Sequence, residues 1–288
     1  MNIFITGGTG FIGRPIVKII ARHRHKILIL SRDPKKNSDF LKWENLQFLK
    51  GDLSDLNSLK NKIKKFHPDV VLHLAWEGVL DYHNPENSIK NLKNSLDFLL
   101  FVSSISCKKI VCAGSGLEYG SLVGKVDESI EAYPSNIFEA AKVALHKLGR
   151  EIAKKYEAQF IWARIFHSYG PNQRSEALIP YLVKCMREGK MPAIKNPNGT
   201  NDYIYVEDVA RAIVKIVEKK NLQYDIYNIA SGQLTSVRDI VNTVYGKNIF
   251  EDSSDEITGR YVDISRVAKE LNWSPKMDIK TGIKKIKK

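Results

Sequence analysis

The stretch Thr6-Gly7-Gly8-Thr9-Gly10-Phe11-Ile12-Gly13 decides the fold of this chain. It follows a short apolar segment at residues 2–5 and leads directly into an amphipathic segment at residues 15–21. A strand, a glycine turn and the start of a helix, in this order, are the context in which a dinucleotide is bound. The alternative is an ordinary glycine-rich turn, which a bare glycine spacing without these flanking segments would favour. We therefore expect a nucleotide cofactor at this turn.

Each glycine of the turn has its own task in binding a dinucleotide. Gly7 permits the tight turn, Gly10 lets a pyrophosphate approach the main chain, and Gly13 lets the helix pack closely on the strand. The free N–H groups and the positive dipole end of that helix attract the pyrophosphate. The predicted cofactor contacts from this turn are Gly7, Thr9, Gly10, Phe11, Ile12 and Gly13.

The composition is typical of a globular protein with a full hydrophobic core. The chain has 288 residues, 43% of them hydrophobic, and no apolar run approaches the ~18 residues of a membrane span. Its N-terminus enters a strand at once, so we expect neither a signal peptide nor association with a membrane. Cys107, Cys112 and Cys185 lack the spacing of metal ligands. We therefore expect no metal site and a reducing, cytoplasmic location.

The net charge of +13 comes from lysines scattered along the chain. Their small clusters are not interleaved with aromatic residues, as they would be in a nucleic-acid groove. The charge therefore indicates a lysine-rich solvated surface, and we expect no nucleic-acid partner. A positive field also favours anionic ligands such as nucleotides.

Strands alternate with helices through the first 165 residues. The predicted strands span residues 2–6, 26–30, 46–49, 69–74, 109–113 and 160–165, and the predicted helices span 11–23, 56–66, 85–106 and 136–156. This alternation predicts an α/β fold with a Rossmann-type doubly wound parallel sheet covered on both faces. Ligands should then lie beyond the carboxyl ends of the strands.

The alternation breaks at Gly170-Pro171. We expect a dinucleotide-binding domain over residues 1–170 and a smaller, substrate-binding C-terminal lobe over residues 171–288. Segments near residues 203–230, with a helix at 206–219 and a strand at 227–229, are expected to return to the sheet.

Basic residues follow the second predicted strand. An acidic residue about 20 positions beyond the glycines would accept hydrogen bonds from the ribose of NAD, but Ser31-Arg32 stands there instead. A guanidinium at this place suits the 2′-phosphate of NADP, so we expect NADP(H) in preference to NAD(H). The alternative for Arg32 is a solvated surface position. Asp52, with Leu53 beside it, is predicted to face the adenine amine or to cap the following helix.

Further motifs occur along the chain in a fixed order. They are Gly51-Asp52-Leu53, His73-Leu74-Ala75, Gly114-Ser115-Gly116-Leu117-Glu118-Tyr119-Gly120, Arg164-x-x-x-x-Tyr169-Gly170-Pro171, Asp202-Tyr203-Ile204-Tyr205-Val206-Glu207-Asp208-Val209 and Leu271-Asn272-Trp273-Ser274-Pro275. Together with the glycine turn they resemble the extended short-chain dehydrogenase/reductase family of sugar-nucleotide epimerases, dehydratases and 4-keto reductases. The resemblance covers nearly the whole chain. It implies further cofactor contacts from Leu74 and Ala75.

The catalytic residues of that family are a Ser or Thr after the fifth strand and a Tyr-x-x-x-Lys pair on the next helix. By the resemblance, Ser115 holds the sugar oxygen that gains or loses a proton; taken alone, it is a strand-end serine that caps a turn. The lysine falls on Lys142, which would bind the nicotinamide ribose and lower the pKa of the tyrosine from about 10. Taken alone, Lys142 is a solvated helix residue.

Phe138 occupies the tyrosine position, four residues before Lys142. The two share a helix face, but no hydroxyl is offered there. Three explanations remain: an engineered Tyr→Phe change, which the persistence of Ser115 and Lys142 favours; a natural protein that binds without turnover; or a different acid. Glu77, Asp81, Tyr82, His83 and His167 are candidates for that acid, though a substrate contact or a satisfied polar residue is the simpler interpretation.

The remaining expectations concern the substrate. The chain has His167 shortly before Tyr-Gly-Pro, as some sugar-nucleotide 4-keto reductases do, and Asn201 where an arginine often holds the phosphates. The predicted substrate contacts are Glu77, His83, Ser115, His167, Arg174 and Arg260.

The resemblance implies an NADP(H)-dependent reductase of a nucleoside-diphosphate 4-keto-6-deoxy sugar, dTDP- or CDP-linked. The alternatives are an epimerase or dehydratase with bound NAD(P), or a catalytically silent protein that binds NADP and a sugar nucleotide. The family commonly dimerises through two helices, here residues 85–106 and 136–156.

Overall fold

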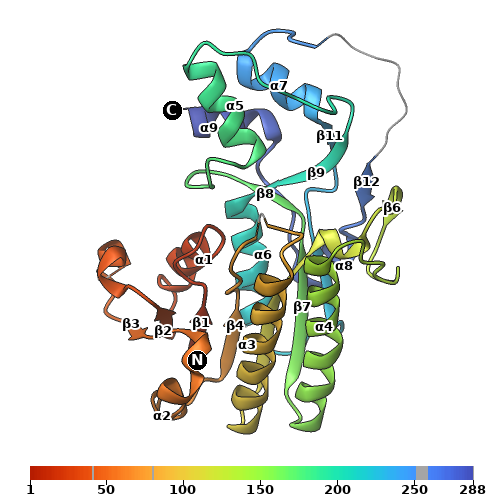
Figure 1. The fold of residues 1–288 in the computed structure, drawn as a ribbon. Coiled ribbons are helices and arrows are strands. Elements are labelled where there is room, and N and C mark those ends of the chain that lie inside the picture. The colour runs from red at the N-terminus through yellow and green to blue at the C-terminus, as the bar shows by residue number, and fades with distance from the viewer. Residues whose placement is uncertain (41, 80, 251–258, 288) are drawn as a thin grey trace.

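The computed structural model describes residues 1–40, 42–79, 81–250 and 259–287. Its centre is a seven-stranded sheet in the order β10-β7-β5-β4-β1-β2-β3, in which every neighbouring pair is parallel (Figure 1). The strands are β1 Asn2–Thr6, β2 Lys26–Ser31, β3 Leu46–Lys50, β4 Val70–His73, β5 Lys109–Ser115, β7 Gln159–Ile165 and β10 Ile226–Ile229. The predicted Rossmann-type fold class is therefore confirmed.

The order of the strands places the site. The chain runs from β1 outward through β2 and β3, and then returns to the other side of β1 at β4. In such sheets a ligand binds at the carboxyl ends of the two strands where the direction reverses, because their connections lead to opposite faces and leave a crevice. The ends of β1 and β4 are that place here.

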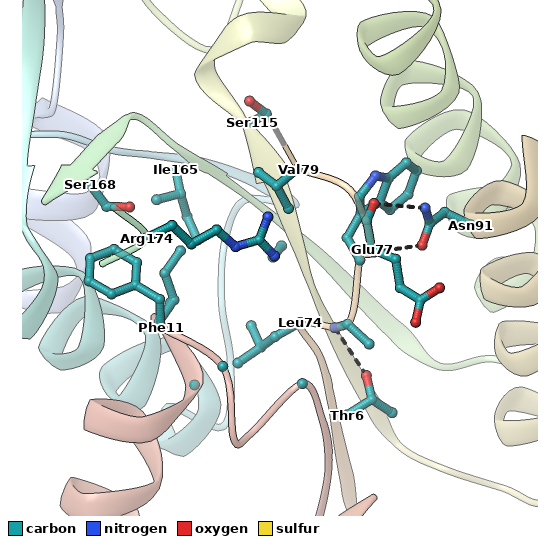
Figure 2. A pocket seen from close by; sticks show the side chains of 18 of the residues that line it. Thr6, Phe11, Leu74, Glu77, Val79, Asn91, Ser115, Ile165, Ser168 and Arg174 are labelled. Carbon is teal, nitrogen blue, oxygen red and sulfur yellow. Dashed lines mark hydrogen bonds between the residues drawn. The ribbon is translucent and has the colours of Figure 1, made fainter. Parts of the chain in front are cut away.

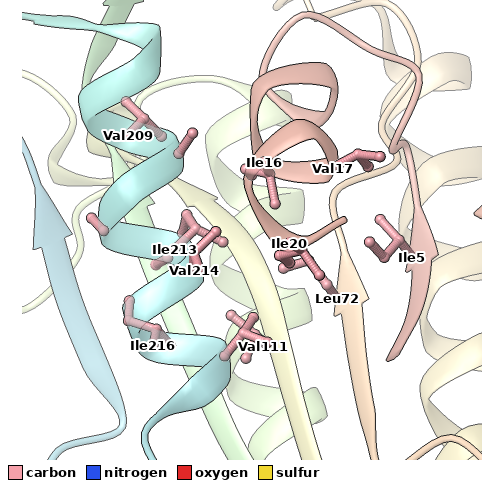
Figure 3. Packing of buried hydrophobic residues seen from close by; sticks show 14 of the residues in the cluster. Ile5, Ile16, Val17, Ile20, Leu72, Val111, Val209, Ile213, Val214 and Ile216 are labelled. Atoms are coloured by element: carbon pink, nitrogen blue, oxygen red, sulfur yellow. The ribbon is translucent and has the colours of Figure 1, made fainter. Parts of the chain in front are cut away.

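Alternate side chains of each strand enter different cores, as the pleat of a strand requires. Ile3 and Ile5 join one cluster, which is formed with α1 (Gly13–Ile20) and α6 (Val206–Glu218). Phe4 joins a second cluster on the opposite face of the sheet. Figure 3 shows the first layer, where Ile16 and Ile20 of α1 face Ile213 and Val214 of α6 across a fully buried core. Both faces of the sheet are thus covered.

The second face of the sheet carries α2 (Leu56–Phe66), α3 (Pro85–Ser104) and α4 (Ile137–Lys155). Asn84 caps α3 by accepting from the backbone N–H of Asn87 at 3.0 Å, and Asn136 caps α4 in the same way through Glu139. These caps satisfy N–H groups that would otherwise lack a partner. The two long helices lie side by side along the sheet (Figure 1). In the part of the chain that is described, no helix has both the length and the apolar composition needed to cross a bilayer.

A smaller lobe lies over the carboxyl ends of the strands (Figure 1). The chain leaves the central sheet after Ile165 and enters it again at β10. The lobe contains a small sheet ordered β11-β9-β8 and three helices with a core of their own. Its elements are β8 His167–Tyr169, α5 Leu178–Arg187, β9 Thr200–Tyr205, β11 Leu234–Ser236, α7 Val237–Tyr245 and α9 Ile279–Lys287. Two further strands, β6 Gly124–Val126 and β12 Arg260–Val262, pair with each other, and α8 spans Ser265–Leu271.

Several predicted boundaries differ from the observed ones. The first helix begins at Gly13 rather than at residue 11 and ends at Ile20 rather than at residue 23. Its end is set by the Asn45 side chain, whose amide donates to the carbonyls of Ala21, His23 and His25 and holds a turn there. That contact joins residues more than 20 positions apart, so the helical pattern could not reveal it.

Candidate functional site

A cavity of about 690 Å³ lies at the carboxyl ends of the central strands, beneath the smaller lobe. This volume is within the range usual for cofactor and small-molecule sites, roughly 300–1,000 Å³. Every residue predicted as a catalytic, cofactor or substrate contact lines this cavity, except His83 and Arg260. Figure 2 shows a part of the lining, with Arg174 reaching toward the middle of the cavity from the lobe side.

The glycine turn is shaped by close backbone approaches. Gly7 has a φ of +71°, and a Cβ there would lie 2.7 Å from the backbone nitrogen of Ala75, so the ends of β1 and β4 touch. A Cβ on Gly13 would lie 2.1 Å from the carbonyl oxygen of Gly7. Ile12, the N-cap of α1, offers no side-chain acceptor to the first N–H groups of the helix, and the first turn has no acidic residue. These N–H groups can therefore receive an anion.

Arg32 stands at the end of β2 with its side chain 69% exposed. Its guanidinium pairs with Glu77, and its Nε lies 3.8 Å from Oδ2 of Asp52. Glu77 also pairs with Lys90 at 3.2 Å. Arginine has five N–H donors, so these carboxylates leave capacity for a further acceptor such as a phosphate. Arg32 thus lines the cavity and is paired with carboxylates, although most of its side chain is exposed to solvent.

Asp52 fills the capping role that was one of its two predicted alternatives. Its Oδ1 accepts from the backbone N–H of Ser54 at 2.8 Å and from the Ser54 hydroxyl at 2.7 Å. The bond from the Ser54 N–H is the main reason why the pKa of Asp52 is lowered. Asp52 also lines the cavity, where its other oxygen, Oδ2, faces Arg32.

Ser115, the last residue of β5, lines the cavity and caps a short turn at Gly116–Tyr119. Its Oγ accepts from the backbone N–H of Leu117 at 3.1 Å, and its own N–H donates to Oε1 of Glu118 at 2.7 Å. A hydroxyl that accepts through one lone pair still has its proton to donate. Ser115 can therefore cap the turn and bind a ligand oxygen at the same time.

Glu118 is fully buried beneath this turn. It accepts from Nε of Arg164 at 3.0 Å and from Nε1 of Trp162 at 2.9 Å, in addition to the N–H of Ser115. Burial raises the pKa of Glu118, and Arg164 together with these donors opposes the shift. Since an unpaired buried charge is costly, this network fixes the backbone at Ser115.

Lys142, one helical turn beyond Phe138 on α4, is only 6% exposed. Its Nζ donates to the carbonyl oxygen of Ala113 at 2.9 Å and lies 3.9 Å from the centroid of the Trp76 ring. Burial lowers the pKa of Lys142 to about 8, while the charge of Glu118 acts in the opposite direction. The solvated helix residue that was the alternative for Lys142 is excluded by this burial.

Phe138 is 3% exposed and lines the same cavity as Ser115 and Lys142. Its ring contacts the rings of Trp76 and Tyr82 edge-on, with centroid distances of 5.8 and 5.2 Å. Burial, followed by the charge of Glu139, raises the pKa of Tyr82. A raised pKa makes Tyr82 a weaker acid than an ordinary tyrosine, although its hydroxyl-bearing ring contacts that of Phe138.

Only some of the predicted substrate residues lie together in the cavity lining. His167 lines the cavity, and burial together with the charge of Arg260 lowers its pKa to about 4, so it is neutral at physiological pH. Arg174 and Glu77 also line the cavity.

His83 and Arg260 lie outside the lining. His83 is exposed just before Asn84, where α3 begins, so the chain carries it away from the cavity. Arg260 is held in the strand pair β6–β12, and its Nη1 donates to the carbonyl oxygen of Gly116 at 2.8 Å. Its guanidinium thus supports the turn after Ser115, and its positive charge helps to lower the pKa of His167.

Sequence reasoning missed Trp76, which lines the cavity between Lys142 and Phe138. It also missed Tyr203 and Gln173, which enter the lining from the lobe side. Only Trp76 left a usable signal, because it follows Ala75 directly at the carboxyl end of β4, where ligands bind in such sheets.

One group of side chains with metal-ligand chemistry lies at the amino-terminal edge of the sheet, away from the cavity. There Oε1 of Glu218 lies 2.5 Å from Nδ1 of His23 and 3.0 Å from Nε2 of His25. One carboxylate oxygen already serves both imidazoles, which accounts for their grouping without a cation, and Nδ1 of His25 has no hydrogen-bond partner in the described part of the chain. We assign no metal site to them.

A sequence model of the NAD dependent epimerase/dehydratase family matches residues 3–230. The chain is 28% identical to a putative UDP-glucose 4-epimerase of Methanocaldococcus jannaschii, with 99% of this chain and 96% of that protein covered. It is 26% identical to the dTDP-4-dehydro-6-deoxyglucose reductase of Escherichia coli, with the same coverage. 

A solved structure extends the likeness to the whole fold. The UDP-glucuronic acid 4-epimerase of Bacillus cereus, in complex with UDP-glucuronic acid and NAD, has a TM-score of 0.87 to this chain at 22% identity. All of this chain and 98% of that one are covered. At this identity, the likeness concerns the fold, including the smaller C-terminal lobe.

Proposed function

Because the chain belongs to the NAD-dependent epimerase/dehydratase family, we propose that it is an NADP(H)-dependent reductase of a nucleoside-diphosphate 4-keto-6-deoxy sugar. The observation that carries this proposal is the composition of one cavity. The glycine turn and Arg32 line one end of it, and Ser115 and Lys142 line it together with Arg174 from the lobe. Such a lining suits a dinucleotide and a second anionic ligand in contact with each other. The same proposal assigns the dinucleotide to residues 1–170 and the sugar nucleotide to residues 171–288.

The roles of the residues follow from their chemistry. A bound nicotinamide would supply a hydride to C4 of the sugar. The hydroxyl of Ser115 donates a hydrogen bond to the C4 carbonyl oxygen, which polarises the carbonyl and stabilises the developing oxyanion. Lys142 would hold the nicotinamide ribose with its ammonium. The oxyanion finally requires a proton, and Phe138 has none to give.

The sugar nucleotide is assigned to the side of the cavity that faces the lobe. Arg174 can form charge-assisted hydrogen bonds with a diphosphate. His167 is neutral at physiological pH, so it can donate or accept one hydrogen bond at the sugar without a charge. Arg260 is assigned no contact with the ligand; it donates to the carbonyl oxygen of Gly116 and so supports the turn after Ser115.

The test of this function is the absorbance of NADPH in the presence of dTDP- or CDP-4-keto-6-deoxyglucose. A reductase consumes one NADPH for each sugar. An epimerase or dehydratase with bound NAD(P), which is the alternative within the family, regenerates its cofactor and changes the sugar without consuming NADPH. A second candidate function, a protein that binds both ligands without turnover, is favoured by Phe138 alone.

The choice of NADP over NAD is tested by Arg32→Ala. A charge-assisted hydrogen bond contributes about 1.5–3 kcal/mol. We therefore expect the Kd for NADPH to rise roughly 10- to 150-fold, with little change for NADH. Isothermal titration with both cofactors measures this. Lys36→Ala is the matched control, because it removes a nearby cation that does not line the cavity. Equal losses for NADH and NADPH would contradict the assignment of Arg32 to the 2′-phosphate.

We also propose a homodimer through α3 and α4, which pack against each other and present apolar side chains to solvent. Ile89 and Leu100 on α3 and Leu148 on α4 are 58, 44 and 49% exposed. Exposed apolar groups on neighbouring helices indicate a protein interface. Sedimentation equilibrium should give twice the mass of one chain, and Leu100→Lys with Leu148→Lys should give a monomer. A monomeric unsubstituted protein at micromolar concentration would refute the dimer.

A further inference from the structure

The ammonium of Lys142 has an unusual set of partners. It is buried, and of its three N–H donors one is taken by the carbonyl oxygen of Ala113. Within the described residues no carboxylate lies within ion-pair distance of it. The indole of Trp76 lies directly beneath its Nζ, 3.9 Å from the ring centroid. At that distance the negative face of an aromatic ring attracts a cation, and most strongly where water is excluded.

The Trp76 indole contacts both Lys142 and Phe138. The Phe138 ring meets it edge-on, with an interplanar angle of 87° and a centroid distance of 5.8 Å. A hydroxyl at position 138 would be one helical turn from Lys142 and would compete for its ammonium. Phe138 carries no hydroxyl, and the aromatic face of Trp76 lies against the ammonium.

The residues before and after Trp76, Ala75 and Glu77, are both fixed by hydrogen bonds of their backbone. Asn91 on α3 accepts from the backbone N–H of Glu77 at 2.9 Å and donates to the Glu77 carbonyl oxygen at 3.0 Å. On the other side, the N–H of Ala75 donates to Oγ1 of Thr6 at 3.3 Å. Figure 2 shows the contacts of Asn91 and of Thr6 as dashed lines on either side of residues 75–77. The backbone on either side of Trp76 is therefore positioned by the sheet and by α3.

We propose that Trp76 is a positioning residue for Lys142, whose indole face keeps the buried ammonium charged and directed into the cavity. This inference rests on the proposed function only in giving Lys142 a ligand, since the contact between the two side chains exists without one. Trp76 acts through Lys142 and is assigned no proton transfer.

The proposal predicts the direction of a pKa change. Burial already favours the neutral amine and lowers the pKa of Lys142 to about 8. A cation–π contact favours the ammonium, so its removal must lower that pKa further. The amine then loses its proton at a lower pH, and a ligand that needs the ammonium loses affinity earlier as the pH rises.

The test compares Trp76→Leu, which keeps an apolar side chain without a ring, with Trp76→Phe, which keeps an aromatic face. The rate of acetylation of the Lys142 amine is measured by peptide mass spectrometry from about pH 6 to about pH 10, because only the neutral amine reacts. We expect the pKa of Lys142 to fall by roughly 0.5–1.5 in Trp76→Leu and by clearly less in Trp76→Phe. Trp43→Leu is the matched control, because Trp43 does not line the cavity.

Binding of NADPH gives a second measurement. We expect its Kd at about pH 9, above the pKa of Lys142, to rise roughly 3- to 30-fold in Trp76→Leu and to recover largely in Trp76→Phe, because the ammonium fraction there falls about tenfold for each unit by which the pKa is lowered. An unchanged Lys142 pKa in Trp76→Leu would overturn the role of Trp76, whether or not NADPH binds. A protein whose Lys142 pKa falls as expected but that binds no dinucleotide in any form would instead overturn the proposed function alone.

Discussion

Replacing Phe138 with tyrosine is expected to raise the rate of NADPH-dependent reduction by about 10²- to 10⁴-fold, the usual contribution of a general acid. The sugar oxyanion formed by hydride transfer needs a proton, and the present side chain cannot supply one. The new hydroxyl would enter a cavity that Ser115 and Lys142 already line. The Lys142 ammonium, four residues further on the same helix face, would lower the pKa of that hydroxyl.

Two further variants isolate the proton transfer. Phe138→Leu removes the ring and offers no proton, so the rate of NADPH-dependent reduction should stay at the level of the unsubstituted protein. Phe138→Tyr combined with Lys142→Met should lose most of the gain, because the new tyrosine then lacks the neighbouring charge that lowers its pKa. The rates are measured as loss of NADPH absorbance with dTDP- and CDP-linked 4-keto-6-deoxyglucose.

The opposite results are equally informative. No gain in Phe138→Tyr with any such substrate would count against the reductase. If the unsubstituted protein already turns over rapidly, another acid acts in place of position 138. Tyr82 is then the first to test by Tyr82→Phe, because its ring lies against Phe138 in the cavity lining. Its raised pKa would then have to be lowered by the bound ligands.

Gly13→Ala is expected to remove dinucleotide binding and to destabilise the fold. The added Cβ would lie 2.1 Å from the carbonyl oxygen of Gly7 and 2.7 Å from Cα of Gly8, both parts of the backbone. Backbone cannot rotate away as a side chain can, so the turn must open. Overpacking of this kind costs about 1–3 kcal/mol of the free energy of unfolding.

The loss of binding should be larger than the loss of stability. Two charge-assisted hydrogen bonds from a displaced turn, at about 1.5–3 kcal/mol each, correspond to more than ~100-fold in Kd. Gly10→Ala is the matched comparison, because its Cβ would meet only the Gly7 carbonyl oxygen, at 3.2 Å. It should keep its stability and still lose affinity, since the methyl group points to where the pyrophosphate approaches. Urea denaturation and NADPH titration measure the two effects. Full NADPH affinity in Gly13→Ala would show that the cofactor does not use this turn.

The parts of the fold that the sequence predicted are those with local causes. The strand, glycine turn and helix at the N-terminus lie within about 20 consecutive residues, and their steric requirements are properties of the backbone itself. The alternation of strands and helices predicted the parallel sheet for the same reason, since each apolar segment must bury its face. Helix ends were less well predicted, because the end of α1 depends on the distant side chain of Asn45.

The residues of the cavity lining were predicted well where they follow the ends of strands, and less well where a distant segment sets the direction of the chain. Ser115 and Lys142 share a cavity because β5 and α4 are adjacent in the fold. His83 was expected there, but the entry into α3 carries it into solvent. Arg260 was expected there too, but its pairing in β12 directs it to the carbonyl of Gly116.

The sequence by itself determined that the chain forms a glycine turn suited to a dinucleotide, and that the tyrosine position beside Lys142 holds a phenylalanine. Only the tertiary structure decided which groups accompany Lys142: the Ala113 carbonyl, the Trp76 ring and, at a greater distance, Glu118. The physical reason is that the backbone conformation of a turn depends mainly on residues that are adjacent in the sequence. The environment of a buried charge is set by segments that meet only when the sheet has formed, and burial then makes each of those contacts stronger than it would be in water.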